Sequence, residues 1–599
     1  MHVKDVHFRR ELSYSSMSWN QFVQTRPGVK LKHASKFRAD LKRGVTSNIE
    51  AVSYIKASRV IQFKDPTLLK ASELVEGQIN YLFLVQTPSD NVVGDGRTSA
   101  VLKYCPPYVK SLGANVFPLR QDRLRIEAAA QAKVHALCPQ YVPELFKYDP
   151  ISHVIIQEYL PDHVKLTTAI HRFNACLPSG LGRDLGYLMS TYLFHTSQYY
   201  LGKDIAVSMA EDFKNEDIFL ANEGIVFNEA FDPDCGSNSY SLELESIVNH
   251  LRLDERVQRQ HARLLSKYRD SKEALIHHDL HFGNLLVGMT TSKGAQTQEV
   301  ISLGRRDVMD HNDVSRVPLQ QTRDVASADA KISHPGSFKA QMLQTSMLSN
   351  DDDDEGWRLS GSLKLIDFEF AMVGPMAYDV GSLLSNLLMA YCVKKHRRLQ
   401  NDRSCLEMQG GDQYSLSNHS LTAGTHPRGS VAKELCPEGG NQAKQDAKEE
   451  CQDHASEQPQ FLIGDELLEE VLPEFLEELS SRLCTSVTTS TCYDDRADEL
   501  IMMSTPVSNF KRDLLLDSWG FAAICMVRLT IGRLHYPPLD AIQPEAWRVS
   551  CSAQILELAH NILVKVNGCA RMHEGGKCEE ISSDFVQLVR ETNGVTGAC

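Results

Sequence analysis

A carboxylate and an amide stand five positions apart in the segment Ile276 to Asn284, which reads Ile-His-His-Asp-Leu-His-Phe-Gly-Asn. An apolar run typical of a strand, Leu285 to Val287, follows at once. A loop carboxylate can accept the proton of an attacking hydroxyl, and an amide oxygen can bind a metal ion. We therefore interpret Asp279 as the catalytic residue of a phosphotransferase and Asn284 as one of its metal ligands.

A second acidic motif lies far downstream, where the apolar run Leu363 to Ile366 is followed by Asp367, Phe368 and Glu369. Side chains alternate along an extended strand, so Asp367 and Glu369 are predicted to point the same way and present both carboxylates to Mg²⁺. Each motif alone also occurs in ordinary loops and at strand ends. Their order, each beside an apolar run, indicates kinase-type phosphoryl transfer with a metal bridging nucleotide phosphates.

Such a site needs a cation for the phosphates and an acid to hold that cation. The segment Ala100 to Tyr104 is typical of a short strand and carries Lys103 near its end. The helix-forming run Arg123 to Ala130 carries Glu127. We assign Lys103 to the nucleotide phosphates and Glu127 to an ion pair with Lys103.

Two further segments are expected to contact the nucleotide. Gly77 and Asn80 lie in a predicted turn that enters a strand covering the phosphates, although one glycine is a weak signal. The small lobe should end after the next apolar strand, where the backbone of Glu158, Tyr159 and Leu160 would meet the adenine.

Taken together, these motifs resemble 5-methylthioribose kinase, a branch of the aminoglycoside phosphotransferase and choline kinase group. The resemblance rests on the catalytic loop, on the Asp-x-Glu motif and on the segment Glu369 to Gly381. It also includes three shorter matches, at Pro106 to Lys110, Leu193 to Ser197 and Gly520 to Arg528.

The resemblance implies a two-lobed, protein-kinase-like α+β fold with a small β-rich N-lobe and a large, mainly helical C-lobe. It implies ATP and Mg²⁺ as cofactors and the anomeric hydroxyl of methylthioribose as the acceptor, in methionine salvage. It places Arg528 and Phe117 near the substrate.

Three positions depart from the family pattern. A glycine before the catalytic Asp is His278 here, a Trp-Pro pair near the substrate lid is Phe117-Pro118, and a paired arginine is Arg528-Leu529. These departures bear on the identity of the acceptor more than on the kinase chemistry.

Composition is that of a large soluble enzyme. The chain has 599 residues, 42% of them hydrophobic, and room for more than one domain-sized core. No run approaches the roughly 18 apolar residues of a membrane helix. A net charge of −14 gives no support to nucleic-acid or anionic-membrane binding. The 15 cysteines show no paired metal spacing, so reduced thiols in a cytoplasmic protein are expected, with a disulfide framework as the alternative.

Polar, low-complexity stretches interrupt the pattern and cannot bury enough apolar surface to offset chain ordering. A basic N-terminus without a hydrophobic core is expected to be a solvated extension, with a transit peptide as the alternative. The predicted division is residues 1–47, basic flexible extension; 48–160, nucleotide-binding N-lobe; 161–289, first part of the C-lobe with the catalytic loop; 290–361, disordered acidic insert; 362–399, metal strand and helix; 400–458, disordered insert; and 459–599, C-lobe helices.

Apolar residues recur at helical spacing between and after the inserts. One such helix, from Leu383 to Tyr391, is expected to end in the basic run Lys394 to Arg398, which would complement its C-terminal dipole. Others are expected over Leu467 to Leu479 and over Ala546 to Val566. These stripes predict a helical core.

Two classes of function fit the sequence. The first is an active small-molecule kinase, for methylthioribose or, as an alternative within the class, for choline or an aminoglycoside. The second is a catalytically silent, kinase-shaped interaction protein, but such proteins commonly lose one of the groups retained here. A small-molecule sugar is the expected partner, without nucleic acid or membrane, and a homodimer stays an open alternative.

Overall fold

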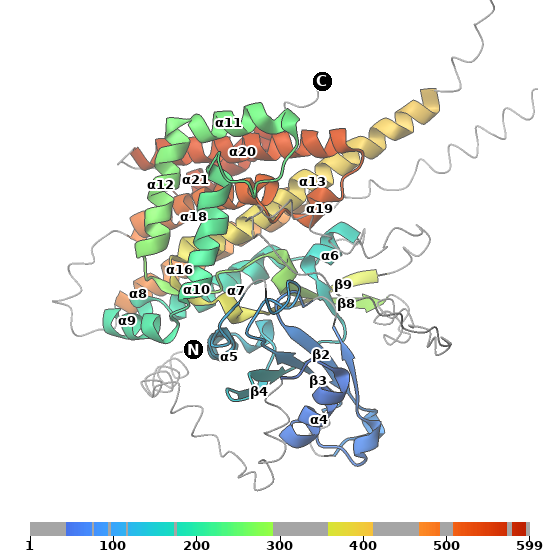
Figure 1. The fold of residues 1–599 in the computed structure, drawn as a ribbon. Coiled ribbons are helices and arrows are strands. Elements are labelled where there is room, and N and C mark those ends of the chain that lie inside the picture. Colours follow the sequence, from blue (N-terminus) through green and yellow to red (C-terminus); the bar gives the residue numbers. More distant parts are fainter. Residues whose placement is uncertain are drawn as a thin grey trace, which may run out of the picture.

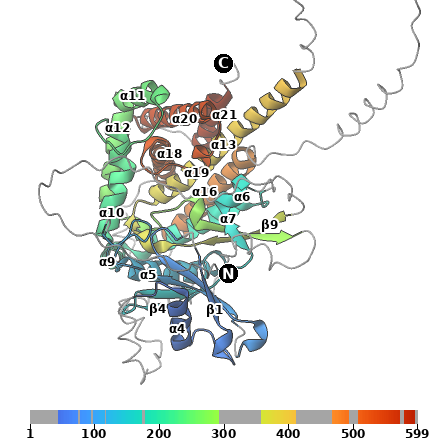
Figure 2. The same ribbon diagram turned by 45° about the vertical axis from the view of Figure 1, so that its right-hand side comes forward.

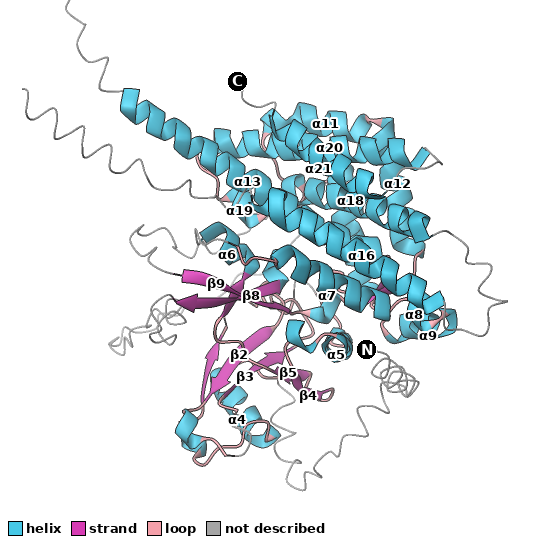
Figure 3. Cartoon of the chain, turned by 180° about the vertical axis from the view of Figure 1, so that it is seen from behind, coloured by secondary structure: helices cyan, strands magenta, loops and turns pink. Residues whose placement is uncertain are grey.

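The chain folds into a small lobe built on a β-sheet and a larger, mainly helical lobe (Figure 1). Figure 3 shows the strands gathered in one half of the molecule and most helices in the other. This arrangement confirms the predicted α+β fold with a small β-rich lobe and a larger, mainly helical lobe. The computed structural model describes residues 44–74, 77–93, 97–115, 118–172, 177–291, 357–410, 466–491, 507–571 and 578–594.

The small lobe has a five-stranded antiparallel sheet with the strand order β1-β2-β3-β5-β4. Its central strand β3 places alternate side chains in the core beneath helix α4 (Asn48–Ser58), while Lys103 faces the other way. The alternation follows from the two-residue period of a strand. The strands are β1 (Lys70–Glu73), β2 (Tyr81–Gln86), β3 (Ser99–Tyr104), β4 (Leu145–Asp149) and β5 (Val154–Gln157).

Helix α5 (Arg123–Leu137) lies between this sheet and the helical lobe (Figure 1). Its run of three alanines, Ala128 to Ala130, favours the helix and allows close packing on both sides. Its N-terminal part packs against the short 3₁₀ helix η11 (Phe368–Phe370), which contains Glu369. The helix therefore connects Lys103 and Glu127 to the second acidic motif.

The segments predicted to be catalytic lie beside two small antiparallel sheets. Strand β7 (Ala274–Ile276) pairs with β10 (Met372–Gly374), and β8 (Leu285–Thr291) pairs with both β6 (His163–Lys165) and β9 (Trp357–Leu365). In the β8–β9 ladder Leu285 lies opposite Leu365. This register brings the residues before β8 next to the residues after β9.

The helical lobe packs around the long buried helices α13, α18 and α20, with α11, α12 and α21 at its far end (Figure 2). Trp519 of α18 is fully buried and stacks on Phe585 of α21, with 4.8 Å between ring centroids. The helices are α6 (Leu166–Arg172), α7 (Leu181–His195), α8 (Gln198–Leu201), α9 (Lys203–Asp212), α10 (Glu216–Glu223), α11 (Glu245–Leu253), α12 (Glu255–Asp270), α13 (Met376–Gly410), α16 (Leu472–Thr491), α18 (Val507–Ile531), α19 (Pro537–Asp540), α20 (Glu545–Arg571) and α21 (Cys578–Gly594).

Two of the described helices, Met376–Arg403 and Asn509–Ile531, are long and apolar enough to cross a membrane. Their most apolar windows are 94% and 89% buried within the protein. Burial against other helices accounts for their composition, because a helix that is apolar all round suits the centre of a large core.

Several predicted boundaries are wrong. Strands β8 and β9 extend into the predicted 290–361 insert, because a two-stranded ladder needs paired backbone more than apolar side chains. Helix α13 passes through the basic run Lys394 to Arg398 and ends at Gly410, inside the predicted 400–458 insert. Residues 1–43, 292–356 and 411–465 lie outside the described part of the chain, as do the other gaps.

Candidate active site

Lys103 lies on the face of the small-lobe sheet opposite helix α4 and contacts two of the predicted acids, Glu127 and Asp367. Its Nζ lies 2.8 Å from Oε1 of Glu127 and also forms an ion pair with Asp367. Lys103 and Glu127 are almost fully buried, whereas the Asp367 side chain keeps 36% of its surface exposed. Burial opposes the charged form of Lys103, but the carboxylates of Asp367, Glu127 and Glu369 outweigh it and raise the lysine pKa. The ammonium is therefore charged.

Asp367 and Glu369 do not sit on a strand, so the geometric reason for pairing them as metal ligands was wrong. Strand β9 ends at Leu365, Asp367 has a positive φ of 69°, and Glu369 lies in η11. The left-handed turn at Asp367 aims its carboxylate at Lys103. Glu369 points to a different set of partners, and its role as a metal ligand stays a prediction.

Glu369 is buried in a polar cluster with Arg123 and Asn80. Its Oε2 accepts hydrogen bonds from Nδ2 of Asn80, at 2.9 Å, and from Nε of Arg123, at 3.1 Å. Arg123 Nη2 also donates to Oδ1 of Asn80, at 3.1 Å. The cluster ties the turn before β2, the start of α5 and the second acidic motif together.

The catalytic loop between β7 and β8 is held by its own side chains and by Asp379 of α13. Nδ2 of Asn284 donates to the backbone oxygen of Asp279 at 2.9 Å and to its Oδ2 at 3.2 Å. The fully buried Asp379 accepts the backbone N–H groups of His277 and His278, at 2.6 and 2.9 Å. These contacts fix the loop backbone on both sides of Asp279.

Across the β8–β9 ladder, the catalytic loop meets the residues before Asp367. The backbone N–H of Ile366 donates to the Asn284 carbonyl at 3.0 Å, and the His277 ring nitrogen Nε2 lies 2.9 Å from the Ile366 carbonyl. The structure therefore places Asp279, Asn284 and Asp367 on adjoining segments, as the split-motif interpretation requires.

The Asp279 carboxylate faces several cationic or polarisable groups. Nε2 of His281 lies 3.5 Å from Oδ2 of Asp279, while its Nδ1 accepts the N–H of Gly283 at 2.9 Å. This hydrogen bond fixes the proton of a neutral ring on Nε2, facing the carboxylate. Burial would raise the Asp279 pKa, but His281, His277 and Arg528 together lower it to about 2.

Arg528 of α18 makes the smallest of these contributions to the lowered pKa of Asp279. Its Nε is buried and has no hydrogen-bond partner among the described residues. Its neighbour Leu529 packs against the helical core. The role of Arg528 near the substrate stays a prediction.

The remaining predicted nucleotide contacts lie around the junction of the lobes. A Cβ on Gly77 would come 2.6 Å from the Asn80 carbonyl oxygen, so the turn before β2 requires a glycine. Glu158, Tyr159 and Leu160 follow β5 and lead to β6, where the chain leaves the small lobe. Oε2 of Glu158 accepts the N–H of Glu144. Phe117 lies outside the described residues.

Sequence reasoning missed several residues that shape this site. Arg123 and Asp379 lie in segments that the sequence analysis singled out, but neither was given a role. An arginine at the start of a helix and an aspartate after a tyrosine are too common to indicate a function. Asn215, whose Nδ2 donates to the Glu369 carbonyl at 2.9 Å, had no signal at all. The spacing of His281 from Asp279 could have been noticed.

The donor set fits a divalent metal with bound phosphates. The carboxyl groups of Asp367, Glu369 and Glu127 lie around two cations, Lys103 and Arg123. Burial raises the pKa of Glu369, and it raises that of Glu127 to about 8. A bound cation would favour the ionised form of both. One buried oxygen, Oε2 of Glu127, has no partner among the described residues. Carboxylate and amide oxygens are the ligands that Mg²⁺ prefers.

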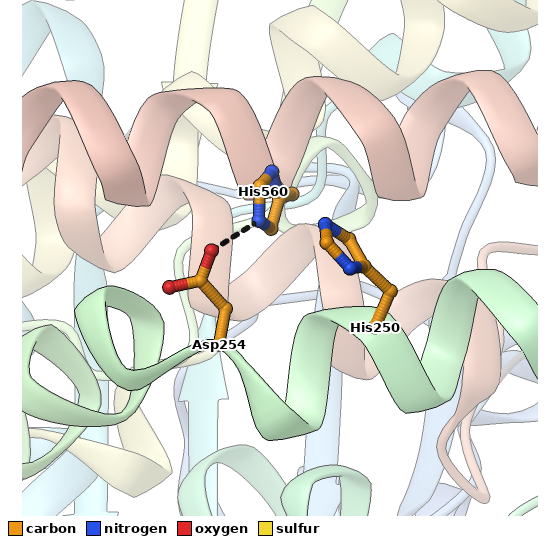
Figure 4. Close-up of side chains that lie close together, drawn as sticks. All are labelled: His250, Asp254 and His560. Carbon is orange, nitrogen blue, oxygen red and sulfur yellow. Dashed lines mark hydrogen bonds and ion pairs between the residues drawn. The ribbon is translucent and has the colours of Figure 1, made fainter.

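A second group of metal-binding side-chain types lies at the far end of the helical lobe (Figure 4). His560 Nε2 lies 2.9 Å from Oδ2 of Asp254, and the His250 ring is 4.8 Å from the His560 ring. However, Asp254 also caps α12 and forms a forked ion pair with Arg256. The Arg256 guanidinium already neutralises the Asp254 carboxylate. We therefore interpret these contacts as structural ones that connect α11, α12 and α20.

Comparison with known proteins finds similarity to methylthioribose kinases. No family model matches the chain. It is 26% identical over 344 residues to the methylthioribose kinase of Citrobacter koseri, which covers 57% of this chain and 65% of that protein. It is 22% identical over 498 residues to that of Pectobacterium atrosepticum, covering 83% of this chain and 88% of that protein. The chain thus spans just under two thirds of the first of these relatives.

Among solved structures, the chain is similar to Plasmodium vivax ethanolamine kinase. The two align with a TM-score of 0.35 and 10% sequence identity, over 89% of this chain and 95% of the other.

Proposed function

We propose that this protein is an ATP-dependent kinase that phosphorylates the anomeric hydroxyl of S-methyl-5-thioribose. The observation that carries the proposal is the convergence of two separate groups. Lys103 is held by Glu127 and Asp367, and Asp279 is held by Asn284 on the adjoining segment. Kinase-type phosphoryl transfer needs a cation for the phosphates, metal-binding oxygens and a carboxylate for the acceptor hydroxyl, placed together.

Lys103 would bind the nucleotide phosphates, with Glu127 keeping its ammonium in place. Asn284, Asp367 and Glu369 would hold Mg²⁺, which when bound neutralises the charge that develops on the transferring phosphoryl group. The turn at Gly77 and Asn80 would cover the phosphates. The backbone of Glu158, Tyr159 and Leu160 would contact the adenine.

Asp279 would orient the acceptor hydroxyl by accepting its hydrogen bond. A carboxylate with a pKa lowered to about 2 is a weak base, and an efficient general base has a pKa near the working pH. Proton acceptance by Asp279 would therefore come late in the transfer, and positioning is its larger contribution. Arg528 would offset negative charge next to Asp279.

The choice of methylthioribose rests on the similarity to methylthioribose kinases. The test is phosphoryl transfer by the purified full chain with ATP and Mg²⁺, using methylthioribose, ribose, choline, ethanolamine and an aminoglycoside as acceptors. We expect the highest kcat/KM with methylthioribose, and product analysis should place the phosphate on the anomeric oxygen.

Asp279→Asn supplies the matched control, because it keeps the shape of the side chain and its contact with Asn284 while removing the charge. A higher kcat/KM with choline or ethanolamine would overturn the choice of acceptor but keep the kinase. Transfer to no acceptor, with ATP still bound, would favour a kinase-shaped interaction protein.

A further inference from the structure

His278 combines an unfavourable backbone conformation with complete burial, directly before the catalytic Asp279. Its φ is 71°, in the left-handed region, and its side chain is 1% exposed. A non-glycine residue with positive φ is uncommon, and such a residue persists where the surroundings over-determine its position. The contacts around the ring supply that constraint.

Both ring nitrogens of His278 have partners, and the partners belong to different elements. Nδ1 lies 3.1 Å from the backbone carbonyl of Phe370, which can only accept, so Nδ1 carries the proton. Nε2 then accepts, with the hydroxyl of Tyr268 at 2.7 Å and the amide Nδ2 of Asn222 at 2.9 Å. One neutral tautomer therefore satisfies every contact.

The ring is also packed between aromatic side chains. It stacks on Tyr268 of α12 with 5.6 Å between centroids and an interplanar angle of 27°. On another side it contacts the ring of Tyr378, at 5.3 Å. Tyr378 precedes Asp379, which binds the backbone N–H groups of the same loop.

We propose that His278 is a positioning residue that holds the predicted catalytic loop against three neighbouring elements at once: η11 through Phe370, α10 through Asn222 and α12 through Tyr268. These contacts set the distance between Asp279 and the segment that contains Asp367. A glycine at this position allows the same backbone turn but makes none of these contacts. The proposal rests on the proposed kinase function only for its effect on rate.

The alternative is that His278 only fills space in the core. In that case its loss would lower the free energy of unfolding of the whole protein without a local effect. If His278 positions the loop, its loss would increase opening of the loop and of η11 selectively. Hydrogen exchange of backbone amides separates the two, since it reports local opening segment by segment. This measurement needs no acceptor and no activity.

The first experiment measures amide exchange by mass spectrometry on the full chain, in wild type, His278→Gly and Tyr268→Phe. We expect exchange in peptides covering residues 277–284 and 366–374 to quicken at least about tenfold in His278→Gly, with peptides of the small-lobe sheet unchanged. Tyr268→Phe keeps the ring and removes one hydrogen bond, so it should show a smaller change in the same peptides. It also covers the case in which His278→Gly fails to fold.

The second experiment measures kinetics with the best acceptor. His278→Gly should lower kcat about 10- to 100-fold, because a shift of Asp279 by about 1 Å or less would misplace it relative to the acceptor hydroxyl. The KM for ATP should change less than about twofold. His278→Asn should recover part of the loss, because asparagine tolerates positive φ and can donate to the Phe370 carbonyl. His278→Ala should not.

Tyr54→Phe is the matched control. Its hydroxyl donates to Oδ2 of Asp149 at 2.6 Å in the small lobe, far along the chain from the catalytic loop. It should lower the melting temperature without changing kcat or the exchange of residues 277–284.

The outcomes separate the two proposals. If wild type phosphorylates no acceptor, the kinase proposal fails, and the exchange data still decide whether His278 positions the loop. If His278→Gly leaves exchange in residues 277–284 and 366–374 unchanged, the positioning role of His278 is overturned whatever the activity.

Discussion

At the scale of single residues, Asp279 is the one whose chemistry can be tested most directly. Asp279→Asn should lower kcat by about 10²- to 10⁴-fold and leave ATP affinity nearly unchanged, because the role proposed for this side chain is to contact the acceptor and not the nucleotide. Isothermal calorimetry with ATP and Mg²⁺ measures the second part. An equal loss of nucleotide affinity would contradict the assignment.

The lowered pKa of Asp279 also predicts a pH profile. A pKa of about 2 lies below that of a free aspartate, so the carboxylate stays ionised as the pH falls and is protonated only in strong acid. Protonation of Asp279 should therefore remove no activity between about pH 8 and pH 5. The contrary result would be a wild-type rate that falls as the pH drops from about 8 to about 5, together with a residual rate of Asp279→Asn that does not fall. That result would show that the pKa of Asp279 is not lowered.

A lysine substitution tests whether Arg528 binds the substrate or only packs in the core, because lysine keeps the charge but lacks the planar guanidinium. If it meets the substrate or the moving phosphoryl group, Arg528→Lys should lower kcat/KM about tenfold or more, since an ammonium cannot reproduce the planar fork. Leu529→Arg should strengthen product binding. Arg512, which donates to the Cys569 carbonyl near the other end of α18, provides a control substitution that should leave kcat/KM unchanged.

The sequence predicted the charged residues that phosphoryl transfer requires, but not the residues that hold them in place. The predicted ion pair between Lys103 and Glu127 is present in the structure, and the catalytic role of Asp279 stays a prediction. Asn222 and Tyr268 lie on helices far from the motifs, and their only link to His278 is spatial. Nothing in their spacing along the chain could reveal it.

At the scale of elements, the largest error concerns the segment after β9. The alternation rule applied to Asp367 and Glu369 fails because the strand stops at Leu365 and the chain turns through a positive φ. A sequence pattern of apolar residues followed by acids does not mark where a strand ends. The consequence is that Asp367 and Glu369 have separate partners, Lys103 and Arg123.

The Arg123 cluster predicts a connection between nucleotide binding and η11. Arg123→Lys should weaken binding of ATP with Mg²⁺ about tenfold, because the lysine cannot bond Glu369 and Asn80 together. Arg120→Lys is the control, since its ion pair with Asp217 is exposed and such pairs contribute little. Equal effects of the two substitutions, measured by calorimetry, would show that the cluster plays no part in binding.

At the scale of the whole molecule, the β8–β9 ladder brings together the two parts of the candidate active site. Strands β8 and β9 pair from Leu285 opposite Leu365 to Thr291 opposite Trp357. Residues 292–356 leave and re-enter at the end of the ladder remote from Asn284 and Ile366. The sequence predicted that an insertion separates the motifs, and the ladder explains how they still meet.

This geometry predicts that residues 292–356 can be removed without loss of catalysis. Thr291 and Trp357 lie directly opposite each other, so a two-residue Asn-Gly turn can join β8 to β9. Closing a long loop costs more entropy than closing a short one, by about 0.6 kcal/mol for each doubling of length. The shortened protein should therefore melt at the same or a higher temperature, with kcat/KM within about twofold of wild type. Replacing the same residues by a Gly/Ser linker of equal length is the control for loop length, and it should match wild type in both measurements. A large fall in kcat/KM at an unchanged melting temperature, in both variants, would mean that the insertion itself contributes to the site.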